Sequence, residues 1–267
     1  MSIVHLKASE DDASGKPSPQ ARATLSSVML GVVRWDDGHT FTSRFALVGL
    51  WIAMGALLTL LVGGQFLGAG TFKTVFGNQQ PLVFLGMAAV LTFAAGEFDL
   101  SIASLLGLSA TLVPVLATNY GWPPLTAALV AIAVAVAAGT VNSVIIVLLG
   151  INPIIVTLGM GTLLLGLASK ISDSTAVGGL SSSFAGISNT QILGLPVTFF
   201  YGVALVLGVT YVMRLTPLGR HMRFVGANRQ VARLAGVRVD RVRMGVYIVS
   251  GLICGVGGVL RGKRWRL

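Results

Sequence analysis

Charged side chains are scarce in this chain. Its 267 residues include only 19 Lys and Arg and 9 Asp and Glu, which is 10% of the total. No charge lies between Asp99 and Lys170, and the mean hydropathy is +0.84. A soluble domain carries about 25% charged residues, because it needs polar side chains to cover its surface. This scarcity excludes a soluble enzyme or a nucleic-acid-binding domain and indicates a polytopic membrane protein.

Cysteine and histidine are also rare. The one cysteine, Cys254, lies in an apolar run, so an intrachain disulfide is excluded. The three histidines lie outside the apolar runs, so these runs lack the His, Cys and Asp constellation of a catalytic membrane enzyme. The chain also lacks the Gly-xxxx-Gly-Lys-Ser/Thr pattern of a phosphate-binding loop. We therefore expect a non-catalytic membrane subunit that has no catalytic residues and binds neither a metal ion nor a cofactor.

Long apolar runs are what the chain has instead. About 20 apolar residues in a helix cross a bilayer core. The runs predict an all-α polytopic transmembrane helical bundle with about seven membrane elements, at least one of them broken or short: residues 45–67, 81–95, 101–117, 125–149, 154–168, 195–213 and 244–260. The polar segment 1–44 is expected to be a partly disordered tail, and 170–193 an exposed loop.

Positive charge is concentrated between the last two runs. Residues 214–243 contain eight arginines against one acidic residue, Asp240. Because cytoplasmic loops are enriched in Lys and Arg, this loop is predicted to face the cytoplasm. Six crossings then place the N-terminal tail on the same side. A nucleic-acid-binding stripe is the alternative, but the flanking spans favour the topological explanation.

Two carboxylates interrupt the apolar stretch Pro81–Ala117 in the sequence Gly-Glu-Phe-Asp-Leu-Ser, residues 96–101. One helix over these 37 residues would exceed about 50 Å, and a bilayer core is about 30 Å thick. The helix must therefore break there, with Asp99 or Ser101 capping the next helix. A discontinuous helix that lines a polar pathway is the alternative, and the role of Glu97 stays open.

A second breaker lies in residues 150–159. Pro153 lacks a backbone donor and is expected to begin a helix, with Asn152 as its cap. A structural turn is the favoured interpretation; the alternative is that Asn152, Pro153 and Thr157 line a pathway. The glycines of Gly251-xxx-Gly255 and the pair at 257–258 are interpreted as sites of close helix packing.

The arginine-rich loop has a pattern of its own. Asn228 can cap a short helix that ends at Gly236, and Val231, Leu234 and Ala235 would form a small apolar stripe on it. Such a helix, held between two spans, suits the docking of a cytoplasmic partner. A helix lying on lipid headgroups is the alternative.

Five motifs in this order closely resemble the ribose/xylose-type permeases of bacterial ABC sugar importers, within the branched-chain amino acid and sugar permease superfamily. The motifs are Gly-Glu-Phe-Asp-Leu-Ser at 96–101, Asn-Pro-Ile-Ile-Val-Thr-Leu-Gly at 152–159, Thr-Pro-Leu-Gly-Arg at 216–220, Gly-Ala-Asn at 226–228 and Leu-Ala-Gly-Val-Arg-Val-Asp at 234–240. The resemblance covers about residues 45–260.

The resemblance implies a permease subunit of the bacterial inner membrane that imports a monosaccharide or a related polyol. It also implies three protein partners besides the membrane lipid: a second permease copy, a cytoplasmic ABC ATPase and a periplasmic sugar-binding protein. Its ATPase-coupling loop would include Gly219, Arg220, Gly226, Asn228, Arg229, Arg233, Gly236 and Asp240.

Two alternatives remain beside this function. An ion-coupled secondary transporter would need a coupling carboxylate within the bundle, for which Glu97 is the candidate. The other alternative comes from the basic tail 261–267, which does not look like the continuation seen in similar permeases. We expect a truncation or a frameshift at this position, which allows a non-functional truncated permease.

Overall fold

The computed structural model describes residues 41–175, 191–192 and 195–262. It is almost entirely helical, with one pair of two-residue strands in the part of the chain that it describes. The expected tail (1–44) and the atypical end (261–267) lie largely outside these residues, as does most of the loop expected at 170–193. The chain divides into two units, residues 1–67 and 68–267.

The described part of the first unit is one helix and a short turn. Helix α2 covers Phe41–Val62, and a 3-10 turn, Gly63–Gln65, follows it. Large apolar side chains on several sides of α2, including Trp51 and Leu60, are exposed. A helix that is apolar all round belongs inside a large core or a membrane. The exposure of these side chains therefore favours the lipid environment predicted for residues 45–67.

The second unit contains the other elements. Six helices of this unit correspond to predicted apolar runs: α4 (Gln80–Ala94), α5 (Ile102–Pro114), α6 (Pro124–Ser143), α7 (Pro153–Ile171), α9 (Val197–Leu215) and α12 (Val239–Gly262). Single π-helical turns continue α5 through Val115–Asn119 and α6 through Val144–Leu148. The smaller elements are α3 (Ala69–Asn78), α10 (Pro217–Ala227), α11 (Arg229–Leu234), and the antiparallel strands β1 (Gln191–Ile192) and β2 (Leu195–Pro196).

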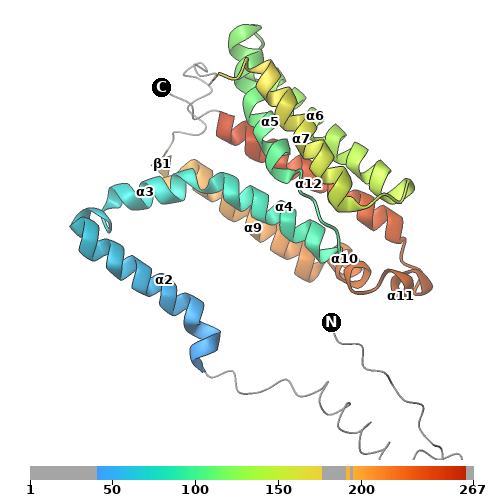
Figure 1. The fold of residues 1–267 in the computed structure, drawn as a ribbon, viewed down its shortest axis with the longest axis horizontal. Helices are drawn as coiled ribbons and strands as arrows, with labels where there is room; N and C mark the ends of the chain where they lie inside the picture. Colours follow the sequence, from blue (N-terminus) through green and yellow to red (C-terminus); the bar gives the residue numbers. More distant parts are fainter. Residues whose placement is uncertain (1–40, 176–190, 193–194, 263–267) are drawn as a thin grey trace, which may run out of the picture. The chain divides into compact units, whose positions relative to one another are not determined.

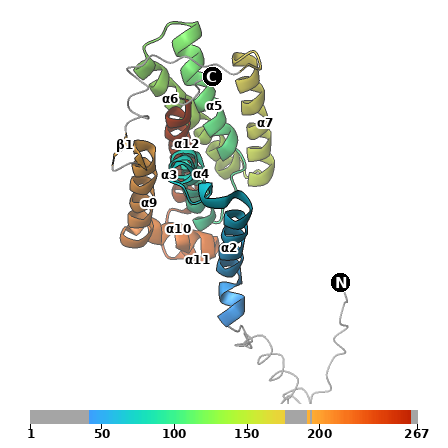
Figure 2. The same cartoon turned by 90° about the vertical axis from the view of Figure 1, so that its left-hand side faces the viewer.

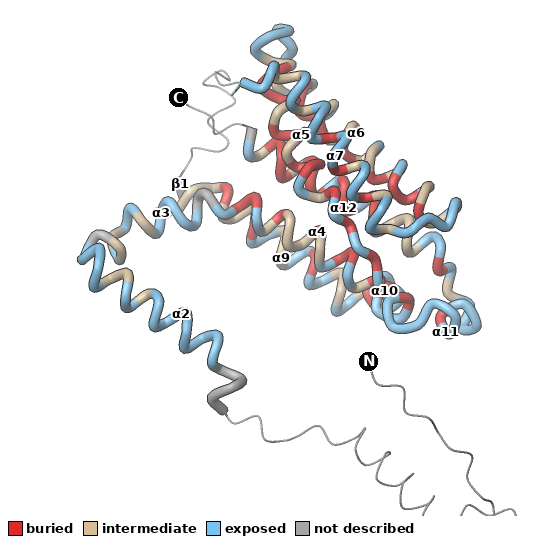
Figure 3. The backbone as a smooth tube through the Cα atoms, in the orientation of Figure 1, coloured by how far each residue is buried: buried red, intermediate tan, exposed pale blue. Residues whose placement is uncertain are grey.

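Helix α12 lies at the centre of this unit. It packs against α6, α5 and α4 (Figures 1 and 2), and α7 and α9 cover the outer faces of α5 and α4. The burial pattern follows this arrangement (Figure 3): red, buried residues concentrate on α4, α5, α6 and α12, and α7 is mostly exposed. An exposed apolar helix surface is what a helix that faces lipid or another subunit presents.

Small residues let α12 approach its neighbours closely, as the sequence predicted. The Cα of Gly251 faces the carbonyl of Ala135 on α6, where an added Cβ would lie 2.6 Å from the carbonyl oxygen. At Gly255 an added Cβ would lie 3.1 Å from the Cα of Ile132, and at Gly257 it would lie 2.9 Å from the Phe84 ring. Glycine at these positions therefore sets the distance between α12 and the helices beside it.

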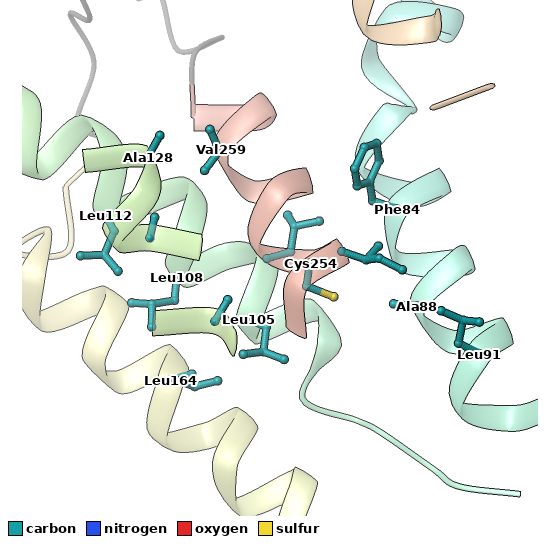
Figure 4. Packing of buried hydrophobic residues seen from close by; sticks show 14 of the residues in the cluster. Phe84, Ala88, Leu91, Leu105, Leu108, Leu112, Ala128, Leu164, Cys254 and Val259 are labelled. Atoms are coloured by element: carbon teal, nitrogen blue, oxygen red, sulfur yellow. The ribbon is translucent and has the colours of Figure 1, made fainter. Parts of the chain in front are cut away.

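The apolar core is built on both sides of α12. Figure 4 shows Phe84, Ala88 and Leu91 of α4 on one side of Cys254, and a group from α5, α6 and α7 on the other, which includes Leu105, Leu108, Leu112, Ala128 and Leu164. The thiol of Cys254 is fully buried within this cluster. The core thus holds α4 and α5 at fixed positions on either side of the same central helix.

The spans differ from the sequence prediction in several details. Five helices in the described residues are long and apolar enough to cross a membrane: α5 and α6 with their π-helical turns, α7, α9 and α12. The apolar helices at Ala46–Val62 and Gln80–Ala94 are shorter. The number of seven crossings therefore stays a prediction. The sequence did not predict the separate helices α3 and α10 or the β1–β2 pair. It also did not predict the start of α12 at Val239 rather than at 244, which places Asp240 in the first turn of α12.

Candidate functional site

The arginine-rich segment folds into two short helices with well-defined ends. Thr216 lies before α10, and its hydroxyl accepts a hydrogen bond from the Gly219 N–H at 3.4 Å. Asn228 separates α10 from α11, and its side-chain oxygen accepts from the N–H groups of Gln230 (2.9 Å) and Val231 (3.1 Å). This is the predicted cap. We call residues 216–236 the α10–α11 segment.

The α10–α11 segment ends where the sequence predicted. Gly236 has φ +80°, a left-handed conformation that suits glycine after a helix C-terminus. Val225 and Ala232 of the segment pack with Val239, the first residue of α12, into a small separate core. The expected apolar stripe faces away from this core, since Val231 is exposed and Leu234 is 90% exposed. The segment is thus held from within and presents a leucine outward.

Ionic side chains also border the exposed face. Nη2 of Arg233 lies 2.8 Å from Oδ1 of Asp240, and both side chains are largely exposed. Arg220 is exposed as well, on α10. An exposed ion pair adds little to stability, so these charges are available to meet a partner without unfolding the segment.

Glycines bring this segment into direct backbone contact with the bundle. A Cβ on Gly219 would collide with the carbonyls of Val212 and Met213 at the end of α9. A Cβ on Gly226 would collide with the carbonyl of Ala94 and would lie 3.1 Å from the Gly96 N atom. The end of α10 therefore rests on the connection that follows α4.

That connection is the predicted helix break. Helix α4 ends at Ala94 and α5 begins at Ile102, so residues 95–101 form the gap between them. Gly96 has φ +70°, and an added Cβ there would lie 3.2 Å from the Cα of Gly226. Both the backbone conformation and the contact require glycine.

Glu97 is fully buried in this gap and is bonded on both carboxylate oxygens. Its Oε1 accepts from Nη2 of Arg229 on α11 at 3.0 Å and from Nε of Arg243 on α12. Its Oε2 accepts from the hydroxyl of Tyr247 at 3.0 Å. The same Arg229 nitrogen donates to the Gly96 carbonyl at 2.9 Å. A buried carboxylate needs such partners to offset its lost hydration.

Asp99 joins a second buried polar group. Its Oδ1 accepts from the backbone N–H of Ser101 (2.9 Å) and from the Ser101 hydroxyl (2.6 Å). Nδ2 of Asn142 on α6 donates to the Ser101 hydroxyl oxygen at 3.0 Å, and Ser250 on α12 donates to Oδ2 of Asp99 at 3.4 Å. The sequence predicted that Asp99 or Ser101 caps α5, but neither side chain accepts a hydrogen bond from an N–H group inside α5. Asp99 holds the turn just before α5.

The second predicted breaker begins α7 and touches the same gap. Oδ1 of Asn152 accepts from the Ile154 N–H at 2.9 Å, and Pro153 is the first residue of α7, so the predicted cap and start are confirmed. The hydroxyl of Thr157 donates to the Pro153 carbonyl at 2.8 Å and accepts from the Leu100 N–H at 3.1 Å. Thr157 therefore fixes the gap against α7.

The candidate residues of the α10–α11 segment and those of the gap at residues 95–101 thus form one site, and the sequence did not predict this contact. Arg229 of the α10–α11 segment and Glu97 of the helix break meet directly. The sequence also missed four partners: Arg243, Tyr247, Asn142 and Ser250. Asn142 had a signal, because it is an amide within an apolar run; Tyr247 and Ser250 had none.

The polar groups of the site bind one another and hold the helices together. Its carboxylates are bound by arginines and hydroxyls, and within the described residues no group of three or more His, Cys, Asp and Glu could hold a metal ion. What the site does offer is a mechanical connection. An exposed two-helix segment rests on the gap in a broken helix, and that gap is bonded to α6, α7 and α12.

Residues 73–264 match a protein family described as the permease component of the branched-chain amino acid transport system. The chain belongs to this permease family. The match includes α4 through α12, and with them both the α10–α11 segment and the helix break. The permease is a multi-pass membrane protein, with the all-α bundle that the sequence predicted.

Several relatives of the permease are named as sugar transport permeases, and others as autoinducer 2 import permeases. It is 27% identical to the fructose import permease protein of Rhizobium meliloti, over 93% of this chain and 74% of the relative. The permease is 30% identical to the L-arabinose transport system permease protein of Escherichia coli, over 83% of this chain and 70% of the relative. It is 27% identical to the D-allose transport system permease protein of the same species, over 86% of this chain and 68% of the relative. No solved structure matches the chain.

Proposed function

We propose that the permease imports a monosaccharide or a related polyol, and that a separate cytoplasmic ABC ATPase drives it by docking on the α10–α11 segment. One observation carries the docking role. The segment is fixed to the bundle by Gly219, Gly226 and Arg229, yet it leaves Leu234 almost fully exposed beside Arg233. An exposed apolar anchor bordered by charge is typical of a protein interface.

The substrate class follows from the relatives. Among the permeases with which this chain shares 27–30% identity, three are named for fructose, L-arabinose and D-allose, and others are named for autoinducer 2. A monosaccharide is therefore the substrate we assign, and the ribose/xylose type stays a prediction. In this assignment the helix break and the start of α7 lie within the transmembrane domain 45–260 and are the candidates for lining the sugar pathway: Glu97, Asp99, Ser101, Asn152, Pro153 and Thr157.

The remaining partners and the location belong to the same proposal. The permease would work in the inner membrane of a bacterium, with a second permease copy and a periplasmic sugar-binding protein. Its N-terminus and the loop 214–243 would face the cytoplasm, as the arginine content predicts. The exposed apolar faces of α7 and α9 suit contact with lipid or the second copy.

Two alternatives have less support. The ion-coupled transporter requires a carboxylate that can bind and release a cation, but both oxygens of Glu97 are engaged by two arginines and a tyrosine. A non-functional truncated permease is tested by the same experiment as the proposal, because such a chain would not support uptake.

The experiment is uptake by reconstituted vesicles. The tagged full chain is purified with the ATPase and binding protein that accompany it, and placed in proteoliposomes with labelled fructose, L-arabinose, ribose or xylose. We expect uptake of at least one sugar that requires ATP on the ATPase side and resists a protonophore. Uptake that follows a proton gradient without ATP, or no uptake of any sugar by an assembled complex, contradicts the proposal.

A further inference from the structure

The gap between α4 and α5 contacts the α10–α11 segment on one side and three helices of the bundle on the other. On the first side are the contacts of Gly96 and Glu97 with Gly226 and Arg229. On the other side Leu100 bonds to α7, while Ser101 bonds to α6 and Asp99 to α12. Besides its contacts with α9 and α12, the segment therefore has a direct route to the gap and, through the gap, to α6, α7 and α12.

Glu97 joins the two sides through one oxygen. Its Oε1 accepts from Arg229 of α11 and also from Arg243 of α12. Arg229 is 43% exposed, whereas Arg243 is 11% exposed and Glu97 is fully buried. The bond to Arg229 thus lies at the rim of the bundle, and the bond to Arg243 lies inside it.

This asymmetry allows one bond to open while the other holds. If α11 moves away, Arg229 enters water, which costs a half-exposed guanidinium little. Glu97 keeps Arg243 on Oε1 and Tyr247 on Oε2, so the buried carboxylate is never left without a partner. The structure shows the closed link, and an open link would leave Glu97 paired, so the pair meets the requirement for a switching element.

We infer that Glu97 is the positioning residue through which the α10–α11 segment controls the gap between α4 and α5, with the Arg229–Glu97 ion pair as the separable link. This inference rests on the proposed function, because it assumes that an ATPase moves the segment. It adds the route by which movement of the α10–α11 segment would reach the transmembrane helices. In this route the ATPase acts on the break in the helix through the Arg229–Glu97 pair, in addition to the direct contacts of the segment with α9 and α12.

The test compares Arg229→Gln with Arg241→Gln in the assembled transporter. Both variants remove one positive charge from the same basic region, but Arg241 is an exposed residue in the first turn of α12 that is not paired with Glu97. Two quantities are measured: the ATP hydrolysed per sugar imported, and hydrogen exchange of residues 95–105 with and without ATP. ATPase co-purification is measured for each variant.

We expect Arg229→Gln to bind the ATPase as the wild type does, but to hydrolyse at least about fivefold more ATP per sugar, the lower end of typical coupling factors. The ATP-dependent change in exchange at 95–105 should also disappear. Arg241→Gln should retain both. A wild-type ATP-to-sugar ratio in Arg229→Gln overturns the inference, and so does loss of ATPase binding, which would make Arg229 a docking residue. If the wild-type chain itself binds no ATPase, the proposed function fails, and this inference fails with it.

Discussion

Arg229 and Glu97 are 132 positions apart in the sequence, yet Nη2 of Arg229 lies 3.0 Å from Oε1 of Glu97. This pair joins the exposed α10–α11 segment to the break between α4 and α5. The arginine-rich loop and the two carboxylates at the helix break, which the sequence analysis treated separately, are therefore parts of one structure.

The first prediction concerns the buried charge. Glu97→Ala would leave Arg243, which is mostly buried, without its carboxylate. Breaking a buried pair in this way costs about 3–5 kcal/mol in the free energy of unfolding. Asp240→Ala removes the partner of Arg233 in an exposed pair and should cost only about 0–1 kcal/mol. Denaturant unfolding in detergent measures both, and equal losses for the two variants would contradict this ranking.

The second prediction concerns the exposed anchor. Leu234 contributes little to the fold because 90% of it is exposed. Leu234→Ala should therefore fold normally but bind the ATPase about 5- to 30-fold more weakly, as expected for an interface anchor worth about 1–2 kcal/mol. Leu60→Ala, at a similarly exposed leucine of α2, is the matched control. Quantitative co-purification provides the measurement, and an equal effect of the two variants would remove Leu234 from the interface.

Charge reversal examines the same interface. We expect Arg233→Glu to weaken association with the ATPase and to leave membrane insertion intact, because the Arg233 side chain is largely exposed. The measurement is the ratio of ATPase to permease after affinity purification from membranes. Unchanged co-purification would argue against docking at α11.

Gly226 at the end of α10 lies in close contact with the backbone of Ala94 and Gly96. Gly226→Ala would drive a methyl group into the Ala94 carbonyl and to within 3.1 Å of the Gly96 N atom. Overpacking of this kind costs about 1–3 kcal/mol. Gly208→Ala in α9 has open space within 4 Å and should be neutral or stabilising. The shift in Tm of each variant in detergent checks the difference, and a neutral Gly226→Ala would show that α10 does not rest on the gap.

Much of the fold could be predicted from local patterns. Long apolar runs located the membrane helices, and Asn152, Asn228 and Gly236 marked helix ends because caps depend on residues close in sequence. The helix break was also predictable, since a 37-residue span is too long for a bilayer. The limits of α12 were not, because Asp240 and the nearby arginines have the composition of a loop, yet the structure begins the helix at Val239.

The composition of the site was harder to predict. The partners of Glu97 come from α11 and α12, and the partners of Ser101 and Leu100 come from α6 and α7. Each of these contacts joins positions that are distant in sequence. No spacing rule relates Tyr247 to Glu97, so only the packed bundle brings them together. Charge patterning indicated that the arginine loop matters, but not that two of its arginines, Arg229 and Arg243, bind the buried Glu97.

The central claim is that the α10–α11 segment lies on the cytoplasmic side and meets a separate ATPase. It is tested most directly by labelling Leu234→Cys with a membrane-impermeant maleimide, since the native Cys254 is buried. The account predicts labelling in inside-out vesicles and not in right-side-out vesicles, with protection when the ATPase is bound. Labelling from the outside, or labelling that the bound ATPase does not reduce, would contradict it.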